Sequence, residues 1–166
     1  MDFNFLIILA AALIPMIIGA IWYNPKVLGK AWMQAAGLTE EKLKNANMVI
    51  ILIVSFIFMF FLAFVMQMLV IHQIHTMAVL YNQPDSGDPN STSMQLMKQF
   101  MELYGNSYRT FKHGAFHGTF SGIMIALPII GTNALFERKG FKYIAINAGY
   151  WIISMALMGG VICAFS

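Results

Sequence analysis

The chain has 166 residues, of which 59% are hydrophobic and only 10% are charged, and its mean hydropathy is +0.70. An ordinary soluble domain has about 25% charged residues, so this composition excludes that class and indicates a membrane protein. The net charge of +3 comes from residues between the apolar segments. No basic stripe with interleaved aromatic residues accompanies it, so a nucleic-acid partner is not expected.

Four apolar segments without Asp, Glu, Lys or Arg are long enough to cross a bilayer as helices, which takes about 20 residues. They are predicted at residues 3–23, 48–81, 113–135 and 143–165, the second including an apolar extension beyond about residue 71. None alternates with the two-residue period of a transmembrane barrel strand. We therefore predict an all-α, single-domain, polytopic membrane protein whose four transmembrane helices form an antiparallel bundle.

The first segment is expected to be a retained transmembrane helix. Asp2 stands where a cleaved signal peptide would have basic residues, and the one Ala-x-Ala site, Ala10 to Ala12, lies in the middle of the run.

The connection after the first span has the pattern of a short helix at the membrane surface. Residues 26–36 place apolar side chains on one face and precede Gly37, a typical residue after a helix C-terminus. Thr39 is a good helix start, from which one helix is expected to run almost unbroken into the second span. Aromatic residues near the headgroups are expected to anchor this end, namely Trp22, Tyr23 and Trp32.

The connection between the second and third spans is the longest polar stretch. Residues 82–93 have the Pro, Gly, Asp and Ser content of a loop, and residues 93–104 follow as a predicted amphipathic helix. We expect this helix to lie on the outer surface, as a cover over the bundle end or against a partner.

Lysine and arginine residues are concentrated between spans one and two and between spans three and four. Because positive charge collects on the cytoplasmic side, both termini are predicted outside. Arg109 and Lys112 oppose this assignment, since they lie close to the other end of the third span.

A stripe of small residues runs along the third span. Small residues four positions apart let a neighbouring helix approach closely in lipid, where hydrophobicity supplies no association. The fourth span has a small stripe of its own, and we predict that the two spans pack against each other. The helix-packing residues are Gly114, Gly118, Gly122 and Ala126 in the third span, and Gly149, Gly159 and Gly160 in the fourth.

All four histidines are expected at one membrane level, with His72 and His75 near the end of the second span and His113 and His117 near the start of the third. Each pair is spaced to share a helix face. One interpretation is interfacial packing and hydrogen bonding between helices. The alternatives are a transition-metal or haem site, or a route for protons or a small solute.

The sequence contains no nucleophile elbow, phosphate loop, paired carboxylates or HExxH motif, so no enzymatic activity and no cofactor beyond the histidine alternative are expected. A small bundle with bulky apolar side chains instead favours a self-associating protein or an accessory subunit of another membrane complex. Cys163 is the one cysteine, which excludes a disulfide within the chain.

Four short motifs near the two ends of the chain resemble those of the bacterial integral-membrane family catalogued as domain of unknown function 1761. The resemblance implies a four-span protein of the bacterial inner (cytoplasmic) membrane and supplies no activity. The connection from residue 82 to 108 is longer than the family pattern suggests. The motifs are Trp22-Tyr23-Asn24-Pro25, Gly29-Lys30-Ala31-Trp32, Phe136-Glu137-Arg138 and Asn147-Ala148-Gly149-Tyr150.

Overall fold

The computed structural model describes residues 4–166, and this part of the chain contains helices and no strand. Four helices are long and apolar enough to span a membrane: α1 (Phe5–Trp22), α4 (Met48–Val70), the continuous helix Phe111–Phe136, and α9 (Phe141–Phe165). The all-α prediction with four spans is therefore confirmed. Phe3, the first residue of the first predicted span, lies outside the described residues.

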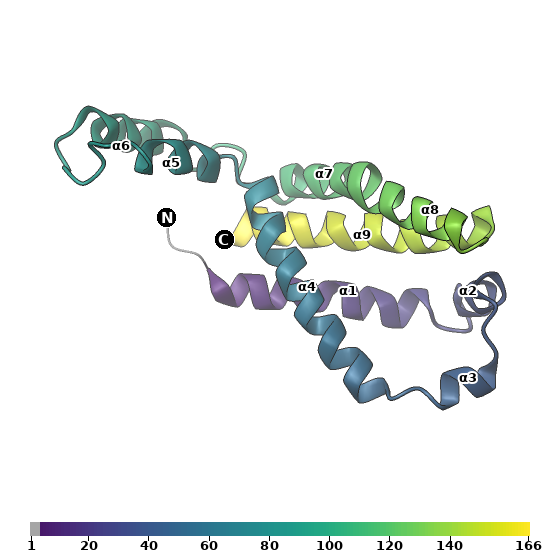
Figure 1. Cartoon of the computed structure of the whole chain (residues 1–166). Coiled ribbons are helices and arrows are strands. Elements are labelled where there is room, and N and C mark those ends of the chain that lie inside the picture. The colour runs from purple at the N-terminus through teal and green to yellow at the C-terminus, as the bar shows by residue number, and fades with distance from the viewer. Residues whose placement is uncertain (1–3) are drawn as a thin grey trace.

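Three of the four spans lie side by side, and the fourth is inclined to them. The central helix α9 is antiparallel to α1 and to the Phe111–Phe136 helix, while α4 crosses them obliquely (Figure 1). The start of α1 and the end of α9 lie at the end of the bundle where α4 leads into α5, and α2 and α3 lie at the opposite end (Figure 1). We call these the α5 end and the α2 end.

Five helices begin at a residue whose side-chain oxygen accepts a hydrogen bond from the backbone N–H three positions later. Such capping satisfies one of the N–H groups that the first turn of a helix leaves without a partner. The capping residues are Asn4, Thr39, Asn47, Ser91 and Thr110.

The surface helix after the first span is α2 (Gly29–Ala36), shorter than the predicted 26–36, and it ends at Gly37 in the left-handed conformation (φ 71°). Thr39 begins a separate short helix, α3 (Glu40–Lys44). The prediction that this helix continues into the second span is wrong. The chain leaves the helix at Asn45, and the side chain of Asn47 caps a new one.

The predicted second span, 48–81, is two helices rather than one. It breaks at Ile71, whose backbone is extended (φ −111°, ψ 96°), and continues as α5 (Gln73–Tyr81) in a new direction. No proline or glycine lies at the break. Ile71 is fully buried in the core. Packing of its side chain therefore offsets part of the cost of the regular helix hydrogen bonds that are lost at the break.

The third span changes its helix type at its centre. It consists of α7 (Phe111–Ser121), a π-helical turn (Gly122–Ala126) and α8 (Leu127–Phe136). Pro128 explains the position of this turn, because proline has no N–H to donate and its ring clashes with the carbonyl four residues earlier. Opening the helix by one residue per turn relieves that clash.

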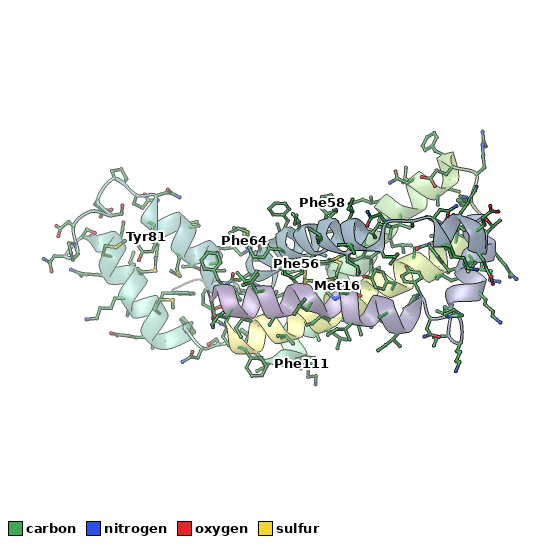
Figure 2. All side chains as sticks on the ribbon, turned by 90° about the horizontal axis from the view of Figure 1, so that it is seen from below. Met16, Phe56, Phe58, Phe64, Tyr81 and Phe111 are labelled. Atoms are coloured by element: carbon green, nitrogen blue, oxygen red, sulfur yellow. The ribbon has the colours of Figure 1, made fainter. Side chains whose placement is uncertain are left out.

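The core lies where α1, α4 and α9 meet near the α5 end. Its members are Ile8, Ala11, Ala12, Met59, Ala63, Met66, Val70, Ile71, Met155, Met158, Ile162 and Cys163. The first half of α4 takes little part, since residues 48–54 are all exposed. Phe58 points away from the bundle, while Phe56 and Met16 lie where α4 faces α1 (Figure 2).

The predicted helix 93–104 is α6 (Thr92–Tyr104), which packs against α5. The two helices extend past the α5 end of the bundle and do not cover it (Figure 1). The expectation of a cover over the bundle is therefore wrong. The side chain of Gln73 joins the two helices, because its Nε2 donates to the carbonyl oxygens of Tyr104 and Ser107 at 2.8 and 2.9 Å.

Candidate functional site

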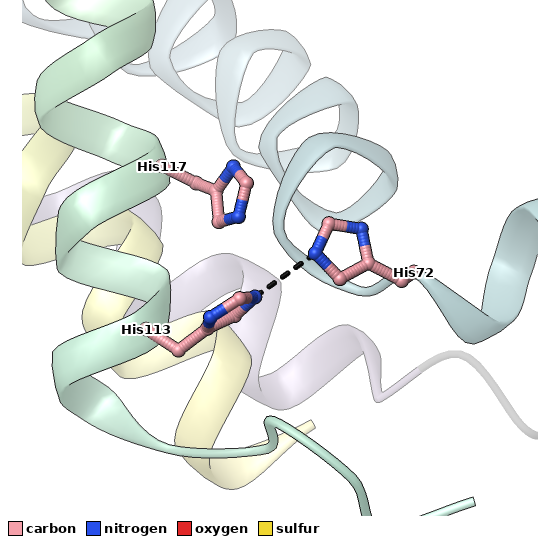
Figure 3. Close-up of side chains that lie close together, drawn as sticks. All are labelled: His72, His113 and His117. Atoms are coloured by element: carbon pink, nitrogen blue, oxygen red, sulfur yellow. Dashed lines mark hydrogen bonds between the residues drawn. The ribbon is translucent and has the colours of Figure 1, made fainter. Parts of the chain in front are cut away.

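Three of the four histidines converge at the α5 end, and we call them the histidine cluster: His72, His113 and His117. His113 and His117 lie one turn apart on α7, and His72 is the residue immediately before α5 (Figure 3). The Nε2 atoms of His72 and His113 are 2.9 Å apart. Each ring offers one nitrogen, and the three nitrogens lie within 4.8 Å of one another.

Two local features bring these rings together. The side chain of Thr110 accepts a hydrogen bond from the backbone N–H of His113 and so fixes the start of α7. The break at Ile71 turns the chain so that His72 points toward α7. His75, one turn farther along in α5, is exposed and lies outside the cluster. Of the two expected histidine pairs, only His113 and His117 both enter the cluster.

The 2.9 Å contact between two imidazole nitrogens requires that one of them donates a proton and the other accepts it. His117 faces both rings edge-on, with ring centroids 4.8 Å from His72 and 4.5 Å from His113. Tyr108 lies on the other side of His113, at a centroid distance of 5.2 Å. His72 is exposed and the other two are half-buried, so solvent or a ligand has access to the cluster.

No hydrogen bond between described residues links polar side chains deeper in the bundle to the imidazole rings of the cluster. The hydroxyl of Ser121 donates to the carbonyl oxygen of His117 in its own helix, at 2.8 Å. The Oε1 atom of Gln67 and the Oγ atom of Ser154 are buried without a hydrogen-bond partner among the described residues.

The small-residue stripe of the third span lies directly on α9. A Cβ atom at Gly114 would overlap the carbonyl oxygen of Gly159, and one at Gly118 would overlap that of Met155. At Gly122 it would lie 2.7 Å from Cα of Ile152. Ala126, farther along, packs against the core. Contact is therefore made backbone to backbone, and α9 is the helix that fills the groove.

Arg109 has a structural role that no local sequence pattern predicts. Its Nε donates to the carbonyl oxygen of Cys163 at 3.1 Å, and its Nη2 donates to that of Ser166. A cation at a helix C-terminus interacts favourably with the helix dipole. Burial lowers the pKa of Arg109, although a guanidinium remains charged at any physiological pH.

Residues of three of the four motifs assemble at the α2 end into what we call the motif cluster: Trp22, Tyr23, Trp32, Asn147, Gly149 and Tyr150. The Nε1 of Trp22 donates to the carbonyl oxygen of Ile146 at 3.0 Å, and the hydroxyl of Tyr23 donates to Oδ1 of Asn147 at 2.9 Å. The ring of Tyr23 contacts those of Trp32 and Tyr150, with centroids 5.1 and 5.2 Å away.

The glycines of these motifs allow the close contacts. A Cβ atom at Gly149 would lie 3.2 Å from the ring of Trp22, and one at Gly29 would overlap the carbonyl oxygen of Tyr23. A Cβ atom at Gly160, near the other end of α9, would lie 2.6 Å from the ring of Phe111. Burial, with smaller contributions from Tyr150 and Tyr143, raises the pKa of the Tyr23 hydroxyl well above its usual range.

The fourth motif stays apart. Phe136 is 85% exposed, Glu137 is also exposed, and Arg138 adopts a left-handed conformation (φ 59°) at the turn into α9. The neighbouring Lys139 donates instead to the carbonyl oxygen of Ala36 at the end of α2.

Residues 6–163 match the family described as "Protein of unknown function (DUF1761)". The chain belongs to the DUF1761 family. The match includes the long connection from 82 to 108, which the motifs alone left outside the resemblance. No curated protein and no solved structure matches the chain. Membership in DUF1761 therefore supplies no activity, and function has to be argued from the geometry.

Proposed function

We propose that this DUF1761 protein is a non-catalytic subunit of the bacterial inner membrane that associates with a second copy of itself through a wedge between α1 and α4. The proposal is carried by one observation. The first half of α4 diverges from the bundle and leaves a shallow, open apolar groove of about 360 Å³ against α1. The residues that line this wedge are Leu13, Met16, Leu52, Ile53, Phe56 and Ile57.

The wedge is incomplete in a single chain. In the most apolar part of α4, 11% of residues are buried, compared with 50% in α9. Inside a bilayer such a gap is filled either by lipid chains or by side chains of another helix. A two-fold symmetric pair places α4 of each copy in the wedge of the other, so that one surface patch covers itself. Van der Waals packing of this kind drives helix association in lipid.

The motif cluster supports a structural role. Trp22, Tyr23 and Tyr150 all carry a polar group at an aromatic ring, a residue type often used in binding sites. Here each of these groups donates to an acceptor of the same chain: Trp22 to Ile146, Tyr23 to Asn147, and Tyr150 to the carbonyl oxygen of Pro15. These hydrogen bonds hold α1 against α9, so the motif cluster stabilises the packing of the two helices.

The proposed orientation places the α2 end in the cytoplasm and both termini outside. It is supported by the concentration of basic residues at that end, in α2, in α3 and around the turn into α9. The start of α1 and the end of α9 lie at the same end of the bundle, which agrees with an even number of spans (Figure 1).

Cysteine cross-linking in membranes tests the proposed self-association. Cys163 is buried and is replaced in the Cys163→Ser background, which leaves one introduced cysteine per chain. Ile53→Cys, in the wedge, is expected to give a dimer with a short bismaleimide linker. Phe58→Cys is the matched control, because Phe58 lies on the same helix and is 63% exposed on the face away from α1.

The result that contradicts the proposal is equal cross-linking of both variants, or none from any wedge position at protein densities where the chain is otherwise folded. Dilution with lipid should lower cross-linking at Ile53→Cys by mass action.

A further inference from the structure

We propose that His72, His113 and His117 bind a divalent transition-metal ion such as Zn²⁺. The inference goes beyond the proposed self-association and does not depend on it, because the histidine cluster and the wedge involve different residues. It rests on the convergence of three imidazole rings, two from α7 and one from the residue before α5, with His72 and His113 separated by 41 positions in the sequence (Figure 3).

The spacing of the nitrogens suits a single ion. Bonds of about 2.0–2.1 Å from zinc to imidazole nitrogen place tetrahedral ligand atoms about 3.3 Å apart. The observed nitrogens bracket this value, since the shortest pair is 2.9 Å apart and all lie within 4.8 Å. Small ring rotations bring all three to one ion. His72 is exposed, so its ring turns without disturbing the core.

Hydrogen bonding alone leaves one ring of the cluster unexplained. The contact between His72 and His113 needs only those two rings. Among residues 4–166, the ring of His117 makes contacts with neighbouring rings and no hydrogen bond. A third imidazole that converges on a pair already bonded to each other is the arrangement expected of a ligand set.

The donor set also selects the class of ligand. Three neutral imidazoles suit Zn²⁺, Cu²⁺ or Ni²⁺, whereas Mg²⁺ and Ca²⁺ prefer the oxygen ligands that the cluster lacks among the described residues. Haem fits less well, because its iron would separate two axial nitrogens by about 4 Å with a porphyrin between them. Three protein ligands with an exposed side leave a fourth position for water or an external ligand.

The position of His72 gives such an ion a structural consequence. His72 follows the break at Ile71 directly and precedes α5. An ion held jointly by His72 and by α7 would fix the α5–α6 pair at one angle to the bundle.

Metal binding to the purified full chain in detergent, without a polyhistidine tag, tests the inference. We expect Zn²⁺ to bind at one ion per chain by titration calorimetry. Co²⁺ should give the visible absorption bands of a tetrahedral nitrogen site. Loss of a residue that only hydrogen-bonds to a metal ligand typically lowers metal affinity by about 10–100-fold. Loss of a ligand itself, in His72→Ala, His113→Ala or His117→Ala, should therefore weaken Zn²⁺ binding by at least about 100-fold.

His75→Ala is the matched control, because it removes a histidine three residues from His72 that lies outside the cluster. It should leave Zn²⁺ affinity unchanged. Circular dichroism and gel filtration identify any variant that fails to fold, and His72→Ala, at an exposed position, keeps the test decisive if the α7 variants unfold. Equal affinity in wild type and His72→Ala, or an equal loss in His75→Ala, would overturn the inference.

Discussion

Two of the membrane-spanning helices, α9 and α4, are built in opposite ways. Helix α9 has glycine and alanine on the faces that meet its neighbours, and half of the residues in its most apolar part are buried. Helix α4 has the higher mean hydropathy, 3.2 against 1.8, yet only 11% of the residues in its most apolar part are buried. Hydropathy therefore indicates which helices can span a membrane, and it does not indicate how deeply each helix is buried in the bundle.

This difference follows from the solvent. Lipid chains are as apolar as leucine, so bulky aliphatic side chains gain little by leaving lipid for a protein interior. Close backbone approach gains dispersion contacts over the whole length of the contact, and glycine permits it. The contact of α7 with α9 at Gly114 and Gly159 shows this, since each would strike the carbonyl oxygen of the other if it carried a Cβ.

The largest expected effect comes from adding one methyl group to the α7–α9 contact. Gly118→Ala places a Cβ atom on the carbonyl oxygen of Met155, so the two helices must separate. We expect the free energy of unfolding to fall by about 3 kcal/mol or more, the upper range for overpacking. Thermal unfolding in detergent, followed by circular dichroism, measures the change.

Gly131→Ala in the same span is the control for Gly118→Ala. Its Cβ atom would lie 3.9 Å from the side chain of Ile144, which is an ordinary van der Waals contact. Alanine is also the better helix former by about 1 kcal/mol. The two substitutions should therefore change stability in opposite directions. Equal stability of Gly118→Ala and wild type would refute the importance of the close contact.

A smaller effect distinguishes the two halves of α4. Met66 is fully buried and its Cε lies near Gly159 of α9, whereas Phe58 is 63% exposed. Met66→Ala leaves a cavity and should cost about 2 kcal/mol, the lower end for such truncations. Phe58→Ala should stay within about 0.5 kcal/mol, as surface changes do. Chemical unfolding in mixed micelles compares them, and a greater loss at Phe58 would show that α4 is packed along its whole length.

The smallest expected effect concerns the polar contacts that hold α1 on α9. Tyr23→Phe removes the hydrogen bond to Asn147 and should cost about 1 kcal/mol at neutral pH. Because burial raises the pKa of Tyr23 in the folded state, its stabilising effect is complete below the ordinary value of about 10 and declines as pH rises above it.

The difference in stability between wild type and Tyr23→Phe should therefore shrink from pH 9 to pH 11. Unfolding curves of both proteins across this range measure it, and ionisation of other groups affects both proteins equally. A difference that is constant with pH would mean that the phenol ionises with equal ease in the folded and unfolded chain.

Much of the bundle was predictable because its signals are local. Uncharged runs located the spans, the four-residue spacing of Gly114, Gly118 and Gly122 marked a close helix contact, and Thr39 and Gly37 marked helix ends. The family assignment rested on short motifs and is confirmed by the match over residues 6–163.

The remaining features depend on contacts between distant parts of the chain. The break at Ile71 has no proline or glycine to announce it, and uniform hydropathy cannot show that α4 leaves the bundle. The sequence also grouped all four histidines, whereas three of them converge and His75 lies outside the cluster. Arg109 lies 54 residues from the carbonyl of Cys163 that it contacts, beyond the reach of any local pattern.

The π-helical turn at Gly122–Ala126 sets the rotation of everything that follows it in the third span. One residue more than a regular helix would need is accommodated there, and each residue of an α-helix corresponds to about 100° around its axis. Removing a single residue from this turn would rotate α8 by that angle and carry Ala134, now buried, toward lipid. The number of residues in the π-helical turn therefore determines which side of α8 faces the bundle, together with the side chains of α8 itself.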